Sequence, residues 1–167
     1  MPEIMQAIAT QFLGAPYQAG LLDIPPKEKL VLALDKFDCE LFVEAVVAIA
    51  RGVAVQDYEF QTFAARIGEQ RYRDGQLDGY CSRLHYFSEW ISANQARGTV
   101  KQITQDLGGI KTSKLLNFMS SNRQTYSQMK SDDTFKCIVQ MEQRLADLEF
   151  IYIPHDKIKQ DYSKMQP

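Results

Sequence analysis

Hydrophobic residues recur at the spacing of one helical face in four stretches of the chain. These are residues 4–13, 57–70, 83–96 and a segment that starts at residue 132 or 133. In the second stretch, the positions expected to face inward are Tyr58, Phe60, Phe63, Ala64 and Ile67. The pattern therefore predicts four amphipathic helices, each with one face against a core.

A fifth helix is predicted by a different pattern. Residues 41–50 are apolar except for Glu44, which leaves no polar face and indicates a helix buried on nearly all sides. Asp38 is a favourable N-cap residue for this helix, and Gly52 is a favourable end. We therefore expect a core helix whose first turn contains Cys39.

Strand signals are few. Residues 14–37 are rich in glycine and proline, which predicts a loop with one short strand at residues 30–34. Residues 150–153 form the best strand candidate, and residues 115–129 are only weakly patterned for helix. Because the sequence contains no repeat or linker, we expect residues 1–167 to form a single, mostly helical α+β domain.

The composition narrows the range of partners. A net charge of −2 and a pI near 5.7 give no basic field, so we expect no nucleic-acid partner. No run of about 18 apolar residues predicts a membrane span, and no secretory signal is visible at the N-terminus. Three cysteines and two histidines lack the spacing of metal ligands, so we expect neither a metal nor a cofactor.

Cys39 is the candidate nucleophile. The first turn of a helix presents unpaired backbone N–H groups and a positive dipole end, which favour the thiolate of a cysteine. Asp38 would cap this helix and could also offer a carboxylate to a substrate ammonium group. The alternative is that Cys39 is simply a small apolar residue that opens a buried helix, and the residues alone favour this alternative.

Four blocks of sequence follow one another between residues 12 and 120. They are residues 12–17 with 37–44, residues 72–75, residues 80–91 and residues 117–120. The first block contains Leu-Gly-x-Pro-Tyr followed by Asp-Cys-x-x-Phe-Val, and in this it resembles the NlpC-type cell-wall peptidases of the papain-like superfamily. The complete series is more specifically similar to their N-acetylmuramoyl-L-alanine amidase-like branch.

The resemblance implies a papain-like fold and a cysteine amidase or peptidase that acts on peptidoglycan fragments or stem peptides in the periplasm or outside the cell. Cys39 matches the nucleophile, and Tyr17 and Asp38 match positions that line the substrate pocket. A histidine would serve as general base and acid. Glu40 stands where the family usually has a small hydroxyl residue, and a second carboxylate beside Cys39 is expected to oppose thiolate formation.

The family places its catalytic histidine on a strand after a Gly-Asp turn, and this sequence contains no such segment. Residues 163–167 resemble the lead-in to that turn. We therefore expect the mostly helical N-terminal portion of the domain, with the catalytic sheet truncated and the chain inactive in this form. The apolar surface left uncovered predicts a dimer or a partner that covers it.

His85 is the candidate substitute base, because Glu89 lies one helical turn later and could orient the imidazole. A surface His–Glu pair, or a histidine in the pocket wall, is the alternative. Ser82 and Arg83 are candidate substrate-binding residues, with a structural salt bridge as the alternative role of Arg83. Two other functions stay open, namely a non-catalytic module that binds stem peptides and a protein in which Cys39 is only part of the core.

Overall fold

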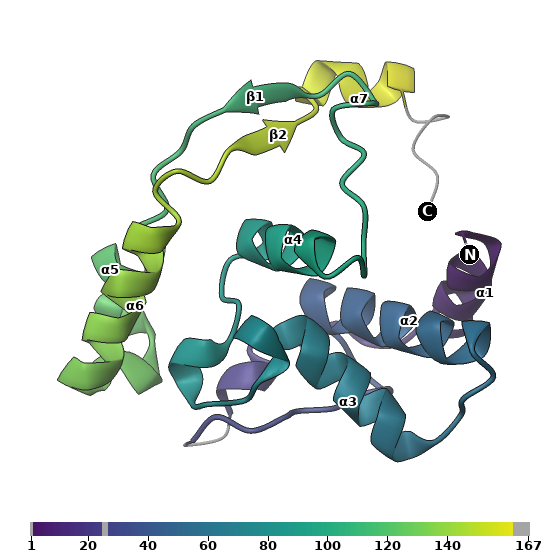
Figure 1. The fold of residues 1–167 in the computed structure, drawn as a ribbon, viewed down its shortest axis with the longest axis horizontal. Helices are drawn as coiled ribbons and strands as arrows, with labels where there is room; N and C mark the ends of the chain where they lie inside the picture. The colour runs from purple at the N-terminus through teal and green to yellow at the C-terminus, as the bar shows by residue number, and fades with distance from the viewer. Residues whose placement is uncertain (1, 25–26, 162–167) are drawn as a thin grey trace. The chain divides into compact units, whose positions relative to one another are not determined.

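The computed structural model describes residues 2–24 and 27–161 (Figure 1). It is rich in helices and contains one two-stranded sheet, in keeping with a mixed class. The elements are α1 (Pro2–Gln11), α2 (Cys39–Ala54), α3 (Phe60–Arg71), α4 (Phe87–Ala96), β1 (Ile110–Thr112), α5 (Phe118–Ser121), α6 (Asp132–Arg144), β2 (Phe150–Tyr152) and α7 (His155–Asp161). Two compact units form, one up to Leu84 and one from His85 onward. Within the described ranges, no helix combines the length and the apolar character needed to cross a bilayer.

The core of the first unit surrounds α2, which packs against α1 and α3. The helix begins at Cys39, as predicted, because the Oδ1 atom of Asp38 accepts hydrogen bonds from the N–H groups of Glu40 (3.1 Å) and Leu41 (2.9 Å). One cluster of buried side chains near this end comprises Leu21, Phe37, Leu41 and Ala45. The capped end of α2 is therefore anchored in the core of this unit.

The other end of α2 differs from the prediction. Gly52 was expected to end the helix, but the helix continues to Ala54. A Cβ atom at Gly52 would lie 2.7 Å from the carbonyl oxygen of Asp57 and 2.9 Å from the Nη1 atom of Arg66. The glycine therefore allows the loop before α3 and a side chain of α3 to approach the helix closely, which is a packing role rather than a terminating one.

The start of α3 was also predicted incorrectly. The helix begins at Phe60, later than expected, and Tyr58 and Phe60 are exposed rather than inward-facing. Asp57 organises this start, because its Oδ1 atom accepts hydrogen bonds from the Glu59 N–H (3.1 Å) and the Thr62 hydroxyl (2.8 Å). The predicted inward position of Ile67 is confirmed, since its side chain is buried.

The strand predicted at residues 30–34 is wrong, since these residues form an irregular segment. The carbonyl of Val31, and that of Lys29 just before this segment, have side-chain partners in place of a neighbouring strand. The Tyr72 hydroxyl donates to the carbonyl of Lys29 (3.1 Å), and Arg71 Nη1 donates to the carbonyl of Val31 (2.6 Å). Side chains from the end of α3 thus satisfy backbone acceptors that a sheet would otherwise satisfy.

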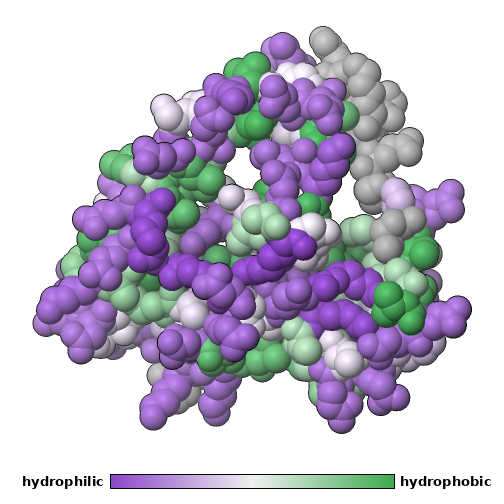
Figure 2. Space-filling model, viewed as in Figure 1, coloured by the Kyte–Doolittle hydropathy of each residue, from purple (hydrophilic) through white to green (hydrophobic). Residues whose placement is uncertain are grey.

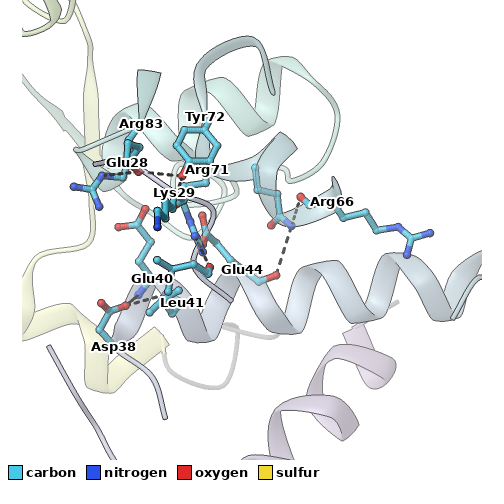
Figure 3. Close-up of polar contacts among 12 residues, drawn as sticks. Glu28, Lys29, Asp38, Glu40, Leu41, Glu44, Arg66, Arg71, Tyr72 and Arg83 are labelled. Atoms are coloured by element: carbon cyan, nitrogen blue, oxygen red, sulfur yellow. Dashed lines mark hydrogen bonds and ion pairs between the residues drawn. The ribbon is translucent and has the colours of Figure 1, made fainter. Parts of the chain in front are cut away.

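A buried ion pair explains the single carboxylate in the apolar pattern of α2. Glu44 and Arg71 are 0% and 1% exposed, and Arg71 Nη2 lies 2.6 Å from Glu44 Oε2 (Figure 3). Arg71 Nε donates to the same oxygen at 3.0 Å. The pair joins α2 to the end of α3, and through Val31 it also holds the preceding loop in place.

The second unit contains the sheet. The strand predicted at residues 150–153 is confirmed as β2, and it pairs antiparallel with β1, with Ile110 opposite Tyr152 and Thr112 opposite Phe150. The helix predicted from residue 83 begins later, at Phe87, and α6 has Ser131 rather than an aspartate at its N-cap position. Residues 115–129 form α5 and short 3₁₀ turns in place of a longer helix.

The short helix α5 is held by a carboxylate from α6. One oxygen of Glu142, Oε1, accepts hydrogen bonds from the Tyr86 hydroxyl (2.6 Å) and from the N–H groups of Met119 and Ser120 (both 3.1 Å). Glu142 is buried. Residues 117–120, one of the blocks singled out from the sequence, therefore have a structural role in this unit.

Replacing Glu142 with alanine is expected to lower the free energy of unfolding by about 2–3 kcal/mol, because buried donors on Tyr86 and α5 lose their acceptor. Urea denaturation followed by circular dichroism measures this change. Glu149→Ala is the control, since Glu149 pairs with Lys111 in an exposed position and should contribute less than about 1 kcal/mol. Equal losses in the two variants would contradict the role given to Glu142.

Candidate active site around Cys39

Cys39 is a free, exposed thiol in the wall of an open pocket with a volume of about 370 Å³. Two segments form this pocket, namely the segment that follows α1 and the start of α2 with the two residues before it. The lining residues are Phe12, Leu13, Gly14, Ala15, Pro16, Tyr17, Phe37, Asp38, Cys39 and Phe42. Three of the residues predicted for the site, Tyr17, Asp38 and Cys39, therefore lie together.

Backbone pairing holds the two segments of the pocket against each other. Tyr17 and Phe37 form a parallel bridge, in which the Gln18 N–H donates to the Phe37 carbonyl (2.9 Å) and the Phe37 N–H donates to the Pro16 carbonyl (3.1 Å). The ring of Phe37 packs edge-on against Phe12, with centroids 4.9 Å apart. The loop that carries Tyr17 is thus fixed beside the first turn of α2.

The walls of the pocket are largely apolar and open to solvent. Leu13 and Tyr17 are 80% and 73% exposed. Figure 2 shows hydrophobic areas interrupting the hydrophilic surface on the viewed face of the molecule. Asp38 supplies a carboxylate to this apolar setting, and its Oδ1 atom is already occupied by the two N–H groups of the cap. The second oxygen of Asp38 is therefore the candidate acceptor for a ligand.

Ser82 and Arg83 do not line this pocket. Ser82 Oγ accepts from the Asp78 N–H (2.9 Å) and donates to the Gly79 carbonyl (2.8 Å), which closes a turn. Arg83 is 5% exposed, and its Nη2 lies 2.5 Å from Asp23 Oδ1. The surroundings of Arg83 match the structural salt bridge that was the alternative in the sequence, and a substrate role for either residue stays a prediction.

Arg83 also belongs to a buried polar cluster near the start of α2. Its Nε atom lies 3.8 Å from Glu28 Oε1, which accepts a hydrogen bond from the Tyr72 hydroxyl (3.0 Å, Figure 3). Burial raises the pKa of Glu28, although the nearby Arg83 charge opposes the rise. The sequence alone did not indicate this cluster, because its members are dispersed along the chain and no local pattern connects them.

The two histidines of the chain, His85 and His155, both belong to the second unit, whereas Cys39 belongs to the first. The first unit therefore contains Cys39 but no histidine. His85 is partly buried and precedes α4, and His155 is the first residue of α7. The role of His85 as general base stays a prediction.

Glu40 has an unusual setting for a carboxyl group in a first helical turn. Its Oε1 atom is buried and has no hydrogen-bond partner. Burial, reinforced by the charge of Glu44, raises the pKa of Glu40 to about 8, with Arg71 and Arg83 opposing the rise. The carboxylate expected to oppose a Cys39 thiolate is therefore mostly uncharged at neutral pH.

A family model described as N-acetylmuramoyl-L-alanine amidase-like matches residues 7–166. The chain belongs to this family. The match runs through the Cys39 pocket and both units, so the blocks found in the sequence and the fold agree on the amidase-like assignment. No curated protein matches the chain significantly.

Several solved structures have a similar fold, and one of them is named as an amidase. An N-acetylmuramoyl-L-alanine amidase from Bacteroides uniformis has a TM-score of 0.86 and 31% identity, over 93% of this chain and 66% of its own. A Bacteroides fragilis protein named as a candidate xylanase has a TM-score of 0.83 and 33% identity, over 90% and 66% of the two chains. A Legionella pneumophila protein at 23% identity and a TM-score of 0.67, over 94% and 58%, shares the fold alone. This amidase-like chain thus spans 66% of the length of the two Bacteroides structures.

Proposed function

We propose that Cys39 is the nucleophile of a cell-wall amidase whose substrates are peptidoglycan fragments or stem peptides. The observation that carries the proposal is the free, exposed Cys39 thiol at the first turn of α2, in the wall of an open pocket, in a chain of the amidase-like family. The name of the Bacteroides uniformis structure supports the amide between muramic acid and L-alanine as the bond cleaved. Such substrates imply a location outside the cytoplasm. For the site we propose the papain-like, NlpC-type arrangement that the sequence blocks resemble.

The proposed reaction proceeds through a thioester. The Cys39 sulfur attacks the amide carbon, the C–N bond breaks, and the leaving amine takes a proton from a general acid. Water then hydrolyses the thioester with the same group acting as base, which returns the thiol and releases a carboxylic acid. His85 is the candidate for this acid–base role, and no cofactor takes part.

The pocket provides recognition as well as a nucleophile. The second oxygen of Asp38 is available to bind a substrate ammonium group, and the exposed Tyr17 ring forms a wall beside it. An apolar pocket with one carboxylate fits the free amino end of a stem peptide that is not attached to muramic acid. In an attached stem peptide the same nitrogen belongs to the amide bond that is cleaved.

We further propose that this chain by itself binds these substrates without hydrolysing them at a useful rate, because the sequence contains no segment that resembles the family's Gly-Asp turn and histidine-bearing strand. The apolar surface that the missing sheet would cover in the family is then expected to be covered by a second copy or another partner. Sedimentation velocity tests the second copy. If the chain stays monomeric at a concentration about 100 times the Kd of a typical weak dimer, a dimer is excluded.

Hydrolysis and binding of purified muropeptides test the proposed function. We expect calorimetry to show binding to the wild type and to Cys39→Ala, and chromatography to show little or no product from either. Tyr17→Ala should weaken binding at least several-fold, and Tyr58→Ala, which changes an exposed tyrosine outside this pocket, should not. Hydrolysis that requires Cys39 would support the nucleophile and overturn the proposed inactivity. Hydrolysis that persists in Cys39→Ala, or a failure to bind, would contradict the proposal.

Muropeptide binding together with a Cys39 that reacts with iodoacetamide no faster than in the unfolded chain would instead favour the non-catalytic stem-peptide module. Hydrolysis of xylan by the wild type would favour the other activity attached to a Bacteroides relative. Glycoside hydrolysis ordinarily uses a pair of carboxylates rather than a thiol. A xylanase reaction should therefore survive Cys39→Ala, which separates it from the amidase reaction in the same assay.

A further inference from the structure

Glu40 directly follows Cys39, and its carboxyl group lies in an environment without a matching cation. The Oε1 atom is buried with no hydrogen-bond partner, although the first turn of α2 is capped normally through the Glu40 N–H. Figure 3 shows the Glu40 side chain extending from the start of α2 toward the side where Arg83 lies. A carboxylate in this position would be costly unless it had a partner.

The two arginines of this region are engaged with other groups. Arg71 donates through Nε and Nη2 to Glu44 and through Nη1 to the carbonyl of Val31. Arg83 pairs with Asp23 through Nη2 and approaches Glu28 through Nε. Within residues 2–24 and 27–161, no ion pair to Glu40 is formed.

Burial, more than the balance of the nearby charges, favours the uncharged form of Glu40. Glu44 lies one turn later on α2, and Asp38 lies just before it, so both negative charges oppose ionisation. Arg71 from α3 and Arg83 from the segment before α4 favour ionisation, but burial outweighs them, and the pKa of Glu40 rises to about 8. Geometry and charge thus agree that Glu40 carries a proton at neutral pH.

We propose that Glu40 is a positioning residue of the Cys39 site, which keeps its proton while Cys39 reacts and so keeps a second negative charge away from the sulfur. This inference rests on the proposed role of Cys39 as nucleophile. Adjacent side chains on a helix point in different directions, so Glu40 acts on Cys39 through space and not by direct contact. When Glu40 loses its proton at alkaline pH, the new charge disfavours the Cys39 thiolate and slows the reaction of the sulfur.

The pH profile of Cys39 alkylation tests this inference. The rate constant for iodoacetamide is measured from about pH 6 to pH 10 for the wild type, Glu40→Gln and Glu40→Met, with Cys39→Ser as the blank. Below about pH 7 the wild type and Glu40→Gln should agree within about twofold. Between about pH 8 and pH 9 the wild type should fall behind by up to about threefold, the effect of a nearby like charge, and the two profiles should converge again near pH 10, where the thiol is ionised in both proteins.

Glu59→Gln is the matched control, because it removes an exposed glutamate at the N-cap position of α3 and should leave the profile unchanged. Superimposed profiles for the wild type, Glu40→Gln and Glu40→Met would overturn the inference, as would a slower reaction of Glu40→Gln at every pH. Glu40→Met provides the second uncharged side chain if Glu40→Gln fails to fold. A failure of the proposed function differs from these outcomes, since Cys39 would then react no faster than in the unfolded chain, whatever residue occupies position 40.

Discussion

Glu44→Ala is expected to lower the free energy of unfolding by about 3–5 kcal/mol, because it leaves the Arg71 guanidinium buried without its carboxylate. The side chains of this pair are 0% and 1% exposed, and the same guanidinium also holds the carbonyl of Val31. The loss should therefore extend to the loop that contains residues 27–36. Urea denaturation monitored by circular dichroism measures the change.

The chain offers a matched control for this prediction. Arg51 of α2 and Glu69 of α3 form a second ion pair between the same two helices, at 2.7 Å, but both side chains are about one-third or more exposed. Glu69→Ala should cost no more than about 1 kcal/mol. Equal losses for Glu44→Ala and Glu69→Ala would mean that burial is not what makes the Glu44–Arg71 pair important.

Glu40→Gln is expected to remove a pH dependence from the stability of the protein. The pKa of Glu40 is raised from 4.5 to about 8 in the folded chain, so the folded state holds a proton that the unfolded state releases between these values. The contribution of this proton is complete below about pH 4.5 and is lost as the pH rises toward about 8. The total loss is about 3–5 kcal/mol, from about 1.4 kcal/mol per pKa unit.

Urea denaturation near pH 5, 7 and 9 measures this effect as the difference between the variant and the wild type. Relative to the wild type, Glu40→Gln should become more stable from pH 5 to pH 8 and should show no further relative gain above that. Asp38 and Glu44 remain in both proteins, so their contributions cancel to first order. A difference that stays constant from pH 5 to pH 9 would contradict the uncharged state assigned to Glu40.

Local patterns predicted the existence of the helices better than the residues at which the helices begin and end. The start of α2 was predicted correctly because the cap is local, with Asp38 binding the N–H groups two and three residues later. The role of Gly52 was not, because it depends on the approach of Asp57 and Arg66. The strand β1 has only three residues and pairs with β2 about 40 residues later, so no local periodicity could indicate it.

In the candidate site, too, local features were predictable from the sequence and long-range contacts were not. Tyr17, Asp38 and Cys39 line one pocket, and it was the family resemblance that implied pocket positions for Tyr17 and Asp38. Arg83 is placed by ion pairs with residues about 60 positions earlier, so its surroundings could not be read from its neighbours in the sequence. The lone Glu44 in an apolar helix did carry a usable signal, because a buried carboxylate requires a buried partner.

The uncharged state of Glu40 was not predictable from its position beside Cys39. A glutamate in a first helical turn is ordinarily ionised and favourable there. Only the burial of its oxygen, and the prior engagement of Arg71 and Arg83, reverse this expectation. The departure from the family at position 40 is therefore compatible with a reactive Cys39.

The most direct test of whether Cys39 is a nucleophile in a substrate pocket is whether a bound muropeptide protects Cys39 from alkylation. The chain is treated with iodoacetamide at pH 7, with and without excess muropeptide, and the modified residue is identified by peptide mass spectrometry. We predict that folded Cys39 reacts several-fold faster than the same cysteine in a peptide spanning residues 37–44, and that muropeptide slows the reaction at least several-fold. A folded Cys39 that reacts no faster than the peptide, or that muropeptide fails to protect, would contradict a nucleophile in a substrate pocket.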